Sequence, residues 1–267
     1  MVPDVRGYGG SARPDAVEAY DMASLTADIA GLIDAFGEDS AILIGHDWGS
    51  PICWNTASFY PERVSAIGIL SVPYHRRLDI PETELWRRLY GDDFFYQLYF
   101  QAEGVAEAEL ESDIRSSLRR IYFTLSGDDP VPDRWLDRTP RPRLLDPFID
   151  PAPFPNWLSE SDLDYLVANF EESGFRGPLN RYRNAERDHE NLPLMNAGPL
   201  RQPSCFIGGS RDVTRHFVPG HDLYEDVGRR CKDLRLGQII EGAGHWVQQE
   251  APDVVTQSLL AFLDTLD

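Results

Sequence analysis

The sequence predicts an α/β fold, in which helices flank a mainly parallel sheet and a helical cap is inserted into it. Two observations lead to this prediction. At both ends of the chain, short apolar strands alternate with amphipathic helices, which is typical of a parallel sheet covered on both faces. In the middle of the chain this alternation is lost, and the sequence becomes helical and rich in proline. We therefore assign residues 1–73 and 193–267 to the sheet domain and residues 74–192 to the cap.

The N-terminal part of the sheet domain contains one predicted helix and two predicted strands. Apolar residues recur every three or four positions over Met22–Phe36 and stop at a glycine, as in an amphipathic helix with a glycine C-cap. Ala41–Ile44 and Val64–Val72 are short apolar runs, which favours buried strands. Residues 2–11, VPDVRGYGGS, are typical of a strand end that runs into a glycine-rich turn.

The remaining elements follow from the same periodicities. Within the cap, the apolar residues of Val105–Leu125 fit one helix face, and those of Ser161–Gly174 fit another. The sheet pattern returns with the strands Pro203–Gly208 and Leu236–Ile240, and Val254–Leu266 is a predicted closing helix.

Asp47 lies in a glycine-flanked turn, GHDWGS, directly after the Ala41–Ile44 strand. Gly45 and Gly49 permit the tight, strained turn that presents a nucleophile at the end of a strand. Here the turn presents a carboxylate, which can attack carbon and form an ester that water must then remove. The alternative is that Asp47 only caps the following helix. A serine esterase is disfavoured because the turn presents no hydroxyl nucleophile.

Two further candidates follow later strands, Asp212 in GSRDVT and His245 in GAGHW. Taken singly, Asp212 could be a turn residue and His245 a solvated surface histidine. The order Asp47, Asp212, His245 is nevertheless that of nucleophile, acid and histidine in the α/β-hydrolase fold. Because functional groups gather at the carboxyl ends of parallel strands, we expect these three side chains to converge.

Composition limits the function classes. The balance of 25 Lys and Arg against 44 Asp and Glu gives a formal charge of −19, which argues against nucleic acid or anionic membranes as partners. Cys53, Cys205 and Cys231 have neither paired nor metal-type spacing, so we expect reduced thiols without a disulfide framework or a zinc site. No apolar run approaches the roughly 18 residues of a membrane span, and we predict a cytoplasmic location.

The chain carries the motifs PDVRGYGGS, GHDWGS, YPERV, YQLYFQ at Tyr96–Gln101, NRYRN at Asn180–Asn184, GSRDVT and GAGHW. Together these motifs resemble those of the soluble epoxide hydrolases of the α/β-hydrolase superfamily, and the match runs nearly end to end. The GHDWGS motif is shared with haloalkane dehalogenases, which also use an aspartate followed by tryptophan. The two tyrosine motifs in the cap, YQLYFQ and NRYRN, are therefore more specific for epoxide hydrolases.

The resemblance implies an α/β-hydrolase fold and an enzyme that converts an epoxide to a vicinal diol. Asp47 is then the nucleophile that forms a hydroxyalkyl ester. Tyr96 and Tyr182 are the phenols that hydrogen-bond the epoxide oxygen as it becomes an alkoxide. His245, oriented by Asp212, activates the water that hydrolyses the ester.

The backbone N–H of Trp48 is expected to hold the carbonyl oxygen of Asp47 as it becomes an oxyanion. Tyr99, one helical turn beyond Tyr96, is expected to have a packing role. This chemistry needs neither a metal nor a cofactor, and the expected partners are a small hydrophobic epoxide and water. The oligomeric state is left open, a homodimer included.

The sequence departs from the family pattern at its N-terminus. Family members carry two leading strands, a central strand that ends in His-Gly-x-Pro, and a helix, all before the PDVRGYG segment. None of the six histidines here begins a His-Gly pair. We therefore expect an N-terminally truncated fold that lacks the second oxyanion N–H and the strand beside Ala41–Ile44, and its activity is in doubt.

Two alternatives follow from these observations. A haloalkane dehalogenase would use Asp47, Asp212 and His245 for the same ester chemistry, with Trp48 as one halide donor. A catalytically impaired, ligand-binding remnant would keep the pocket without the oxyanion loop. The identity of the epoxide, the selectivity and the physiological role, whether detoxification or lipid or secondary metabolism, are left open by the sequence.

Overall fold

The computed structural model describes residues 1–131 and 133–266, so Pro132 and Asp267 lie outside the described residues. The chain divides into two compact units. The sheet unit comprises Met22–Leu78, Leu125–Asp128 and Leu192–Asp267. The helical unit comprises Met1–Asp21, Asp79–Thr124 and Asp129–Asn191. The predicted domain boundaries at 73/74 and 192/193 stay predictions.

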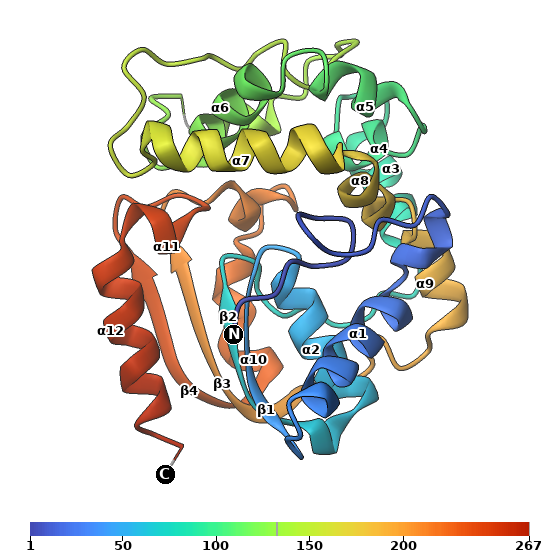
Figure 1. The fold of residues 1–267 in the computed structure, drawn as a ribbon, viewed down its shortest axis with the longest axis vertical. Helices are drawn as coiled ribbons and strands as arrows, with labels where there is room; N and C mark the ends of the chain where they lie inside the picture. Colours follow the sequence, from blue (N-terminus) through green and yellow to red (C-terminus); the bar gives the residue numbers. More distant parts are fainter. Residues whose placement is uncertain (132, 267) are drawn as a thin grey trace. The chain divides into compact units, whose positions relative to one another are not determined.

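The sheet unit is built on four parallel strands in the order β1-β2-β3-β4 (Figure 1). The strands are β1 (Ala41–His46), β2 (Val64–Leu70), β3 (Leu200–Gly209) and β4 (Cys231–Ile240). The predicted parallel sheet is therefore confirmed. β1 forms one edge of the described sheet, where the side chains of Ile42 and Ile44 are 41% and 46% exposed.

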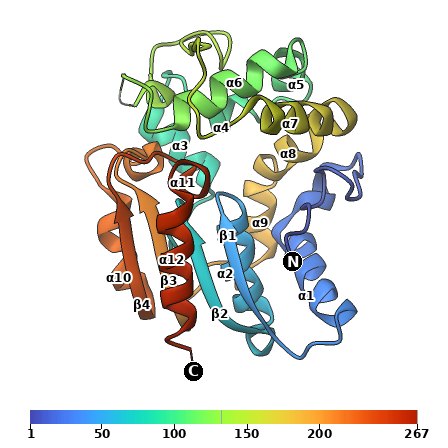
Figure 2. The same cartoon turned by 60° about the vertical axis from the view of Figure 1, so that its left-hand side comes forward.

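Helices cover both faces of this sheet (Figures 1 and 2). On one face α2 packs against β1, β2 and β3, with α1 behind it, while α12 packs against β3 and β4. Trp54, Ile67 and Phe206 are buried on the α2 face, and Phe262 is buried on the α12 face. The helices of this unit are α1 (Met22–Ala35), α2 (Gly49–Phe59), η2 (Pro61–Arg63), η4 (Val213–His216), η5 (Leu223–Asp226), α10 (Val227–Arg230), α11 (Val247–Glu250) and α12 (Pro252–Leu263).

The helical unit contains α3 (Glu82–Tyr90), α4 (Tyr96–Tyr99), α5 (Val105–Leu110), α6 (Ile114–Leu125), η3 (Arg134–Leu136), α7 (Glu160–Ser173), α8 (Arg176–Tyr182), α9 (Ala185–Asn191) and, near the N-terminus, η1 (Val17–Tyr20). The prediction of one helix over Val105–Leu125 is wrong, because α5 and α6 are separate. The carboxylate of Asp113 accepts a hydrogen bond from the backbone N–H of Ser116 at 3.0 Å and so begins a new helix.

The first residues group with the helical unit rather than with the sheet. The guanidinium of Arg181 on α8 donates to the carbonyl of Tyr20 at 2.7 Å and pairs with the carboxylate of Asp188. The predicted strand end within residues 2–11 is not formed, whereas the glycine turn is, with the Tyr8 N–H donating to the Val5 carbonyl at 2.9 Å. A strand persists only where a neighbouring strand completes its hydrogen bonds, and the described sheet begins at β1.

Cys53, Cys205 and Cys231 are free and buried. Burial raises the pKa of the Cys53 and Cys205 thiols to about 12, which keeps them protonated and unreactive. Among the helices formed by the described residues, none is long and apolar enough to cross a membrane.

Candidate active site

Asp47 lies in the sharp turn between β1 and α2, and its backbone φ is +49°, in the left-handed region. A Cβ atom at Gly45 would lie 2.2 Å from the carbonyl carbon of Gly49, so only glycine fits at position 45. Gly49 is not required in the same way, because a Cβ built there would point into open space. The alternative that Asp47 caps α2 fails, because the N-cap residue is Trp48 and the Asp47 carboxylate contacts His245.

The structure brings together the three side chains that follow β1, β3 and β4. His245 Nε2 lies 3.2 Å from Asp47 Oδ2, and His245 Nδ1 lies 3.2 Å from Asp212 Oδ2. The Asp47 side chain is 41% exposed, whereas that of Asp212 is fully buried. An accessible carboxylate such as Asp47 can reach a substrate, whereas a buried one such as Asp212 can only orient the histidine. The difference in exposure therefore distinguishes what the two aspartates can do.

The protonation states in this cluster are set by the two carboxylates. Burial alone would lower the pKa of His245, but the charges and hydrogen bonds of Asp212 and Asp47 outweigh it and raise the pKa to about 10. Desolvation would raise the pKa of each aspartate, but the contact with His245 lowers both. A backbone hydrogen bond from Trp48 lowers the pKa of Asp47 further. At neutral pH these shifts favour a protonated His245 between two ionised carboxylates.

Asp212 is held by partners that the sequence does not reveal. Its Oδ1 accepts the backbone N–H of Thr214 at 2.9 Å, and its Oδ2 accepts the hydroxyl of Tyr224 at 2.8 Å. Tyr224 is buried, and its ring lies only 2.5 Å from the position of a Cβ at Gly208, so the glycine makes room for it. No motif points to Tyr224, because nothing local to its segment in the sequence marks it as a neighbour of Asp212.

The main chain of His245 is also fixed at both polar atoms. Its carbonyl accepts the Ser71 hydroxyl at 2.6 Å and contacts His46 Nε2 at 2.8 Å, and its N–H donates to the Leu125 carbonyl at 2.8 Å. Burial and the charge of His245 lower the pKa of His46 to about 4. A neutral His46 must therefore carry its proton on Nε2 to donate to that carbonyl.

Glu250 clamps the loop that carries His245. Its carboxylate accepts three backbone N–H groups, from Gly244 at 2.9 Å, Gly127 at 2.8 Å and Trp246 at 3.0 Å. A Cβ at Gly244 would lie 2.4 Å from the nitrogen of Gly127, so the two backbones touch here. The histidine loop is thus tied to the Leu125–Asp128 segment of the same unit.

Tyr96 on α4 and Tyr182 on α8 lie side by side within the helical unit. Their ring centroids are 5.9 Å apart at an interplanar angle of 79°. Phe100 contacts both rings, at centroid distances of 5.5 Å and 5.0 Å. Edge-to-face packing of this kind fixes ring orientation without using the hydroxyl groups. Sequence reasoning named both tyrosines and missed Gln97, whose amide Nε2 donates to the Tyr96 hydroxyl at 2.9 Å.

Tyr99 has the packing role that was predicted for it. Its ring packs against Phe94 and Phe100, and its hydroxyl donates to the Glu109 carboxylate at 2.7 Å. Burial and that carboxylate raise the pKa of Tyr99 well above its usual range. Its proton is therefore committed to Glu109.

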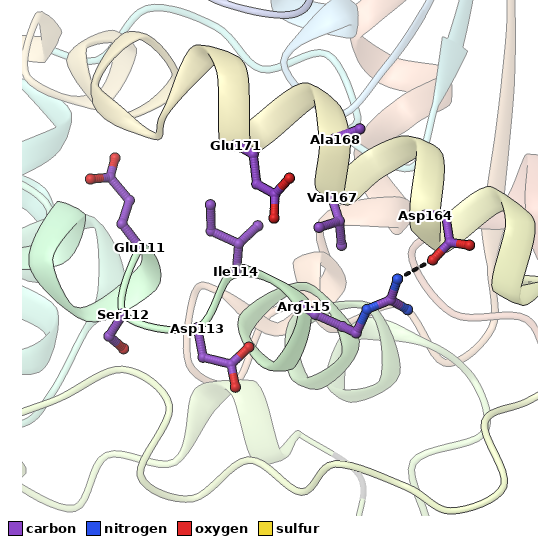
Figure 3. Close-up of a pocket in the computed structure, with 9 residues that line it drawn as sticks. All are labelled: Glu111, Ser112, Asp113, Ile114, Arg115, Asp164, Val167, Ala168 and Glu171. Atoms are coloured by element: carbon purple, nitrogen blue, oxygen red, sulfur yellow. Dashed lines mark hydrogen bonds and ion pairs between the residues drawn. The ribbon is translucent and has the colours of Figure 1, made fainter.

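A groove of about 720 Å³ in the helical unit lies between the start of α6 and α7 (Figure 3). Its charged side chains are mostly acidic, with Arg115 paired to Asp164 across it. Sites for small apolar ligands are lined mainly by hydrophobic side chains, unlike this groove. None of the five predicted catalytic side chains lines it.

Across residues 1–131 and 133–266, no group of three His, Cys, Asp or Glu side chains is arranged to hold a metal ion.

Known proteins of similar sequence share this fold. A family model described as the alpha/beta hydrolase fold matches residues 1–252. Epoxide hydrolase A of Mycobacterium tuberculosis is 40% identical over 277 aligned positions, which cover the whole of this chain and 82% of the relative. Epoxide hydrolase B of the same organism is 32% identical, with 98% of this chain and 83% of the relative covered.

Solved structures agree with the sequence comparison. Epoxide hydrolase A from Mycobacterium thermoresistibile superposes with a TM-score of 0.90 at 41% identity, covering 98% of this chain and 81% of that structure. An epoxide hydrolase from an endophytic Streptomyces superposes with a TM-score of 0.92 at 43% identity, covering 98% of this chain and 80% of that structure. The predicted fold and the predicted resemblance are both confirmed. The chain therefore belongs to the α/β-hydrolase fold family and, within it, to the epoxide hydrolases.

Proposed function

We propose that this chain converts an epoxide to a vicinal diol through a covalent ester on Asp47. The observation that carries the proposal is the position of His245 between two carboxylates of unequal exposure, with an aspartate at the strained turn where a nucleophile stands. An aspartate that is ionised, partly exposed and unable to leave its turn is suited to attack carbon.

In the first step, one Oδ atom of Asp47 forms a bond to an epoxide carbon, and the C–O bond of the ring breaks. The alkoxide that develops takes a proton from Tyr96 or Tyr182, which is the role that the resemblance implies for them. The lowered pKa of Asp47 supports this step, because the carboxylate is ionised at neutral pH.

In the second step, His245 must be neutral to act as a base. Esterification removes the negative charge of Asp47, which is one of the two groups that raise the pKa of His245. The pKa then falls, and the imidazole releases a proton that can restore the phenol through solvent. His245 next takes a proton from water, and the hydroxide adds to the carboxyl carbon of Asp47.

The backbone N–H of Trp48 stabilises the oxyanion that forms in this second step. Its hydrogen bond to the Asp47 carboxyl group in the free enzyme supports that role. The acyl C–O bond then breaks, His245 returns its proton to the diol, and the acid proton of Asp47 passes back to His245. Neither step requires a metal or a cofactor.

Two measurements test the proposal. In His245→Gln exposed to styrene oxide, the ester should accumulate and be seen by intact mass spectrometry as an adduct on Asp47. In H₂¹⁸O under single-turnover conditions, the first diol should carry unlabelled oxygen, because that oxygen comes from Asp47 and the label enters the enzyme. Labelled diol in the first turnover would contradict a covalent ester.

Activity assays on the purified chain of 267 residues distinguish the two alternatives, a haloalkane dehalogenase and a ligand-binding remnant. Halide release from a bromoalkane without diol formation from styrene oxide would favour a haloalkane dehalogenase. Epoxide turnover that is lost in Asp47→Ala would exclude the ligand-binding remnant. The relatives described above are epoxide hydrolases, which supports the epoxide over the haloalkane.

A further inference from the structure

We propose that Gln97 is a positioning residue that directs the hydroxyl proton of Tyr96 toward the substrate, and that Trp86 sets the orientation of Gln97. The inference rests on the proposed function, because it gives a direction to the proton that Tyr96 is proposed to donate. It is carried by two hydrogen bonds within the helical unit.

The first hydrogen bond fixes the Gln97 amide. The indole Nε1–H of Trp86 lies 2.9 Å from Gln97 Oε1. An indole nitrogen can only donate, so the atom that faces it must be the carbonyl oxygen of the amide. The side chain of Trp86 is buried and packs against Phe95 and Tyr90, which hold the indole in place. The amide of Gln97 therefore has a single orientation, because the flipped one would place its NH₂ group against the indole N–H, donor against donor.

The second hydrogen bond follows from the first. With Oε1 committed to Trp86, Gln97 presents its NH₂ group to the Tyr96 hydroxyl, at 2.9 Å. The NH₂ group has no lone pair to offer, so the hydroxyl oxygen must accept. The proton of Tyr96 therefore points to a different acceptor, and accepting a hydrogen bond makes the phenol a stronger donor.

The backbone supports this arrangement. Gln101 Nε2 donates to the carbonyl of Gln97 at 2.8 Å and to the carbonyl of Tyr182 at 3.0 Å. One side chain therefore ties α4 to α8 at the two proposed phenols. Tyr99, one turn further along α4, has a different hydroxyl partner, since it donates to the Glu109 carboxylate.

Two substitutions of Gln97 distinguish a proton-directing role from a packing role. Gln97→Glu keeps the shape and still accepts from Trp86, but its second carboxylate oxygen would capture the Tyr96 proton. Gln97→Met keeps the approximate size and leaves Tyr96 its proton. Proton direction predicts that Gln97→Glu is the more damaging of the two, whereas a packing role predicts the reverse.

The experiment measures ester formation alone. Each variant is made in the His245→Gln background, and the mass gain of the chain with styrene oxide is followed over time. We expect ester formation to be about a hundredfold slower in Gln97→Glu, as for loss of one placed donor, and about tenfold slower or less in Gln97→Met. With His245 intact, quench-flow should show an unchanged rate of ester hydrolysis in both. Trp86→Phe, which lets the amide flip, should slow ester formation by a few-fold.

Gln257 on α12 is exposed, so Gln257→Glu is the control for an added negative charge and should leave both rates unchanged. Two results would overturn the role of Gln97 without touching the covalent mechanism. One is ester formation as fast in Gln97→Glu as in the His245→Gln parent, and the other is slower ester formation in Gln97→Met than in Gln97→Glu. Absence of any adduct in the His245→Gln parent would overturn the covalent mechanism, and the role of Gln97 with it.

Discussion

The two units hold their candidate catalytic groups by different physical means. In the sheet unit, the buried ring of His245 lies 3.2 Å from each of two carboxylates, and electrostatic attraction stabilises this arrangement. In the helical unit, two phenols are held by neutral aromatic rings and one amide. Esterification of Asp47 would remove one of the charges that raise the pKa of His245, whereas the rings and the amide that hold the phenols carry no charge. The first arrangement suits a base that must switch between steps, and the second suits a donor that must stay ready.

The largest effect is expected from Asp212→Asn. This substitution keeps the shape of the acid but removes the charge that orients His245, so ester hydrolysis should slow by roughly 10⁴-fold, as in other triads. Ester formation by Asp47 should change far less. Rapid-quench kinetics with styrene oxide separate the two steps, and a comparable loss in both would show that the charged cluster serves more than the second step.

The phenols should show the opposite pattern. Tyr96→Phe and Tyr182→Phe each remove one donor to the developing alkoxide, so ester formation should slow by about a hundredfold, while ester hydrolysis stays near its original rate. Tyr99→Phe is the matched control, because its proton is committed to Glu109. If Tyr99→Phe slowed ester formation as much as Tyr96→Phe, the assignment of the donor would be wrong.

A smaller effect is expected from the clamp on the histidine loop. Glu250→Gln replaces one of the two carboxylate oxygens that accept the three backbone N–H groups by an NH₂ group, which can only donate. His245 should then be less well positioned, and ester hydrolysis should be about tenfold slower. Exposed Glu241 in the same loop offers the matched control, Glu241→Gln. An unchanged hydrolysis rate in Glu250→Gln would mean that the remaining hydrogen bonds suffice to hold the loop.

The smallest signal is a pH dependence of stability. His245 has a folded pKa of about 10 against 6.5 for the free side chain, so its contribution is complete below pH 6.5 and is lost as the pH rises toward 10. The lowered pKa values of Asp47 and Asp212 act at the other end, because their contributions are lost as the pH falls through the acidic range.

Asp47→Asn removes one of the two charges that raise the pKa of His245. The decline in the free energy of unfolding between pH 6.5 and 10 should therefore be shallower than in the unmodified chain. Urea unfolding across that range measures it, with His245 followed by NMR. Identical slopes in both proteins would show that Asp212 alone sets the pKa of His245.

Much of this architecture follows from local patterns in the sequence. The four strands, the turn at Asp47 and the convergence of Asp47, Asp212 and His245 were predicted, because short apolar runs and glycine turns depend only on neighbouring residues. The single helix over Val105–Leu125 was predicted wrongly, since apolar spacing continues through a break that the Asp113 cap imposes.

The sequence by itself determined the family and the order in which the candidate residues Asp47, Asp212 and His245 follow their strands. Only the tertiary structure revealed Tyr224 on Asp212, Glu250 on the histidine loop and Gln97 on Tyr96. Tyr224 and Glu250 are ordinary residues in their own segments. Gln97 adjoins Tyr96 in the chain, yet its role depends on the indole of Trp86. A hydrogen bond between side chains depends on how separate elements pack against one another. Turn residues and apolar periodicity predict strands and tight turns from neighbouring residues, but they carry no information about that packing.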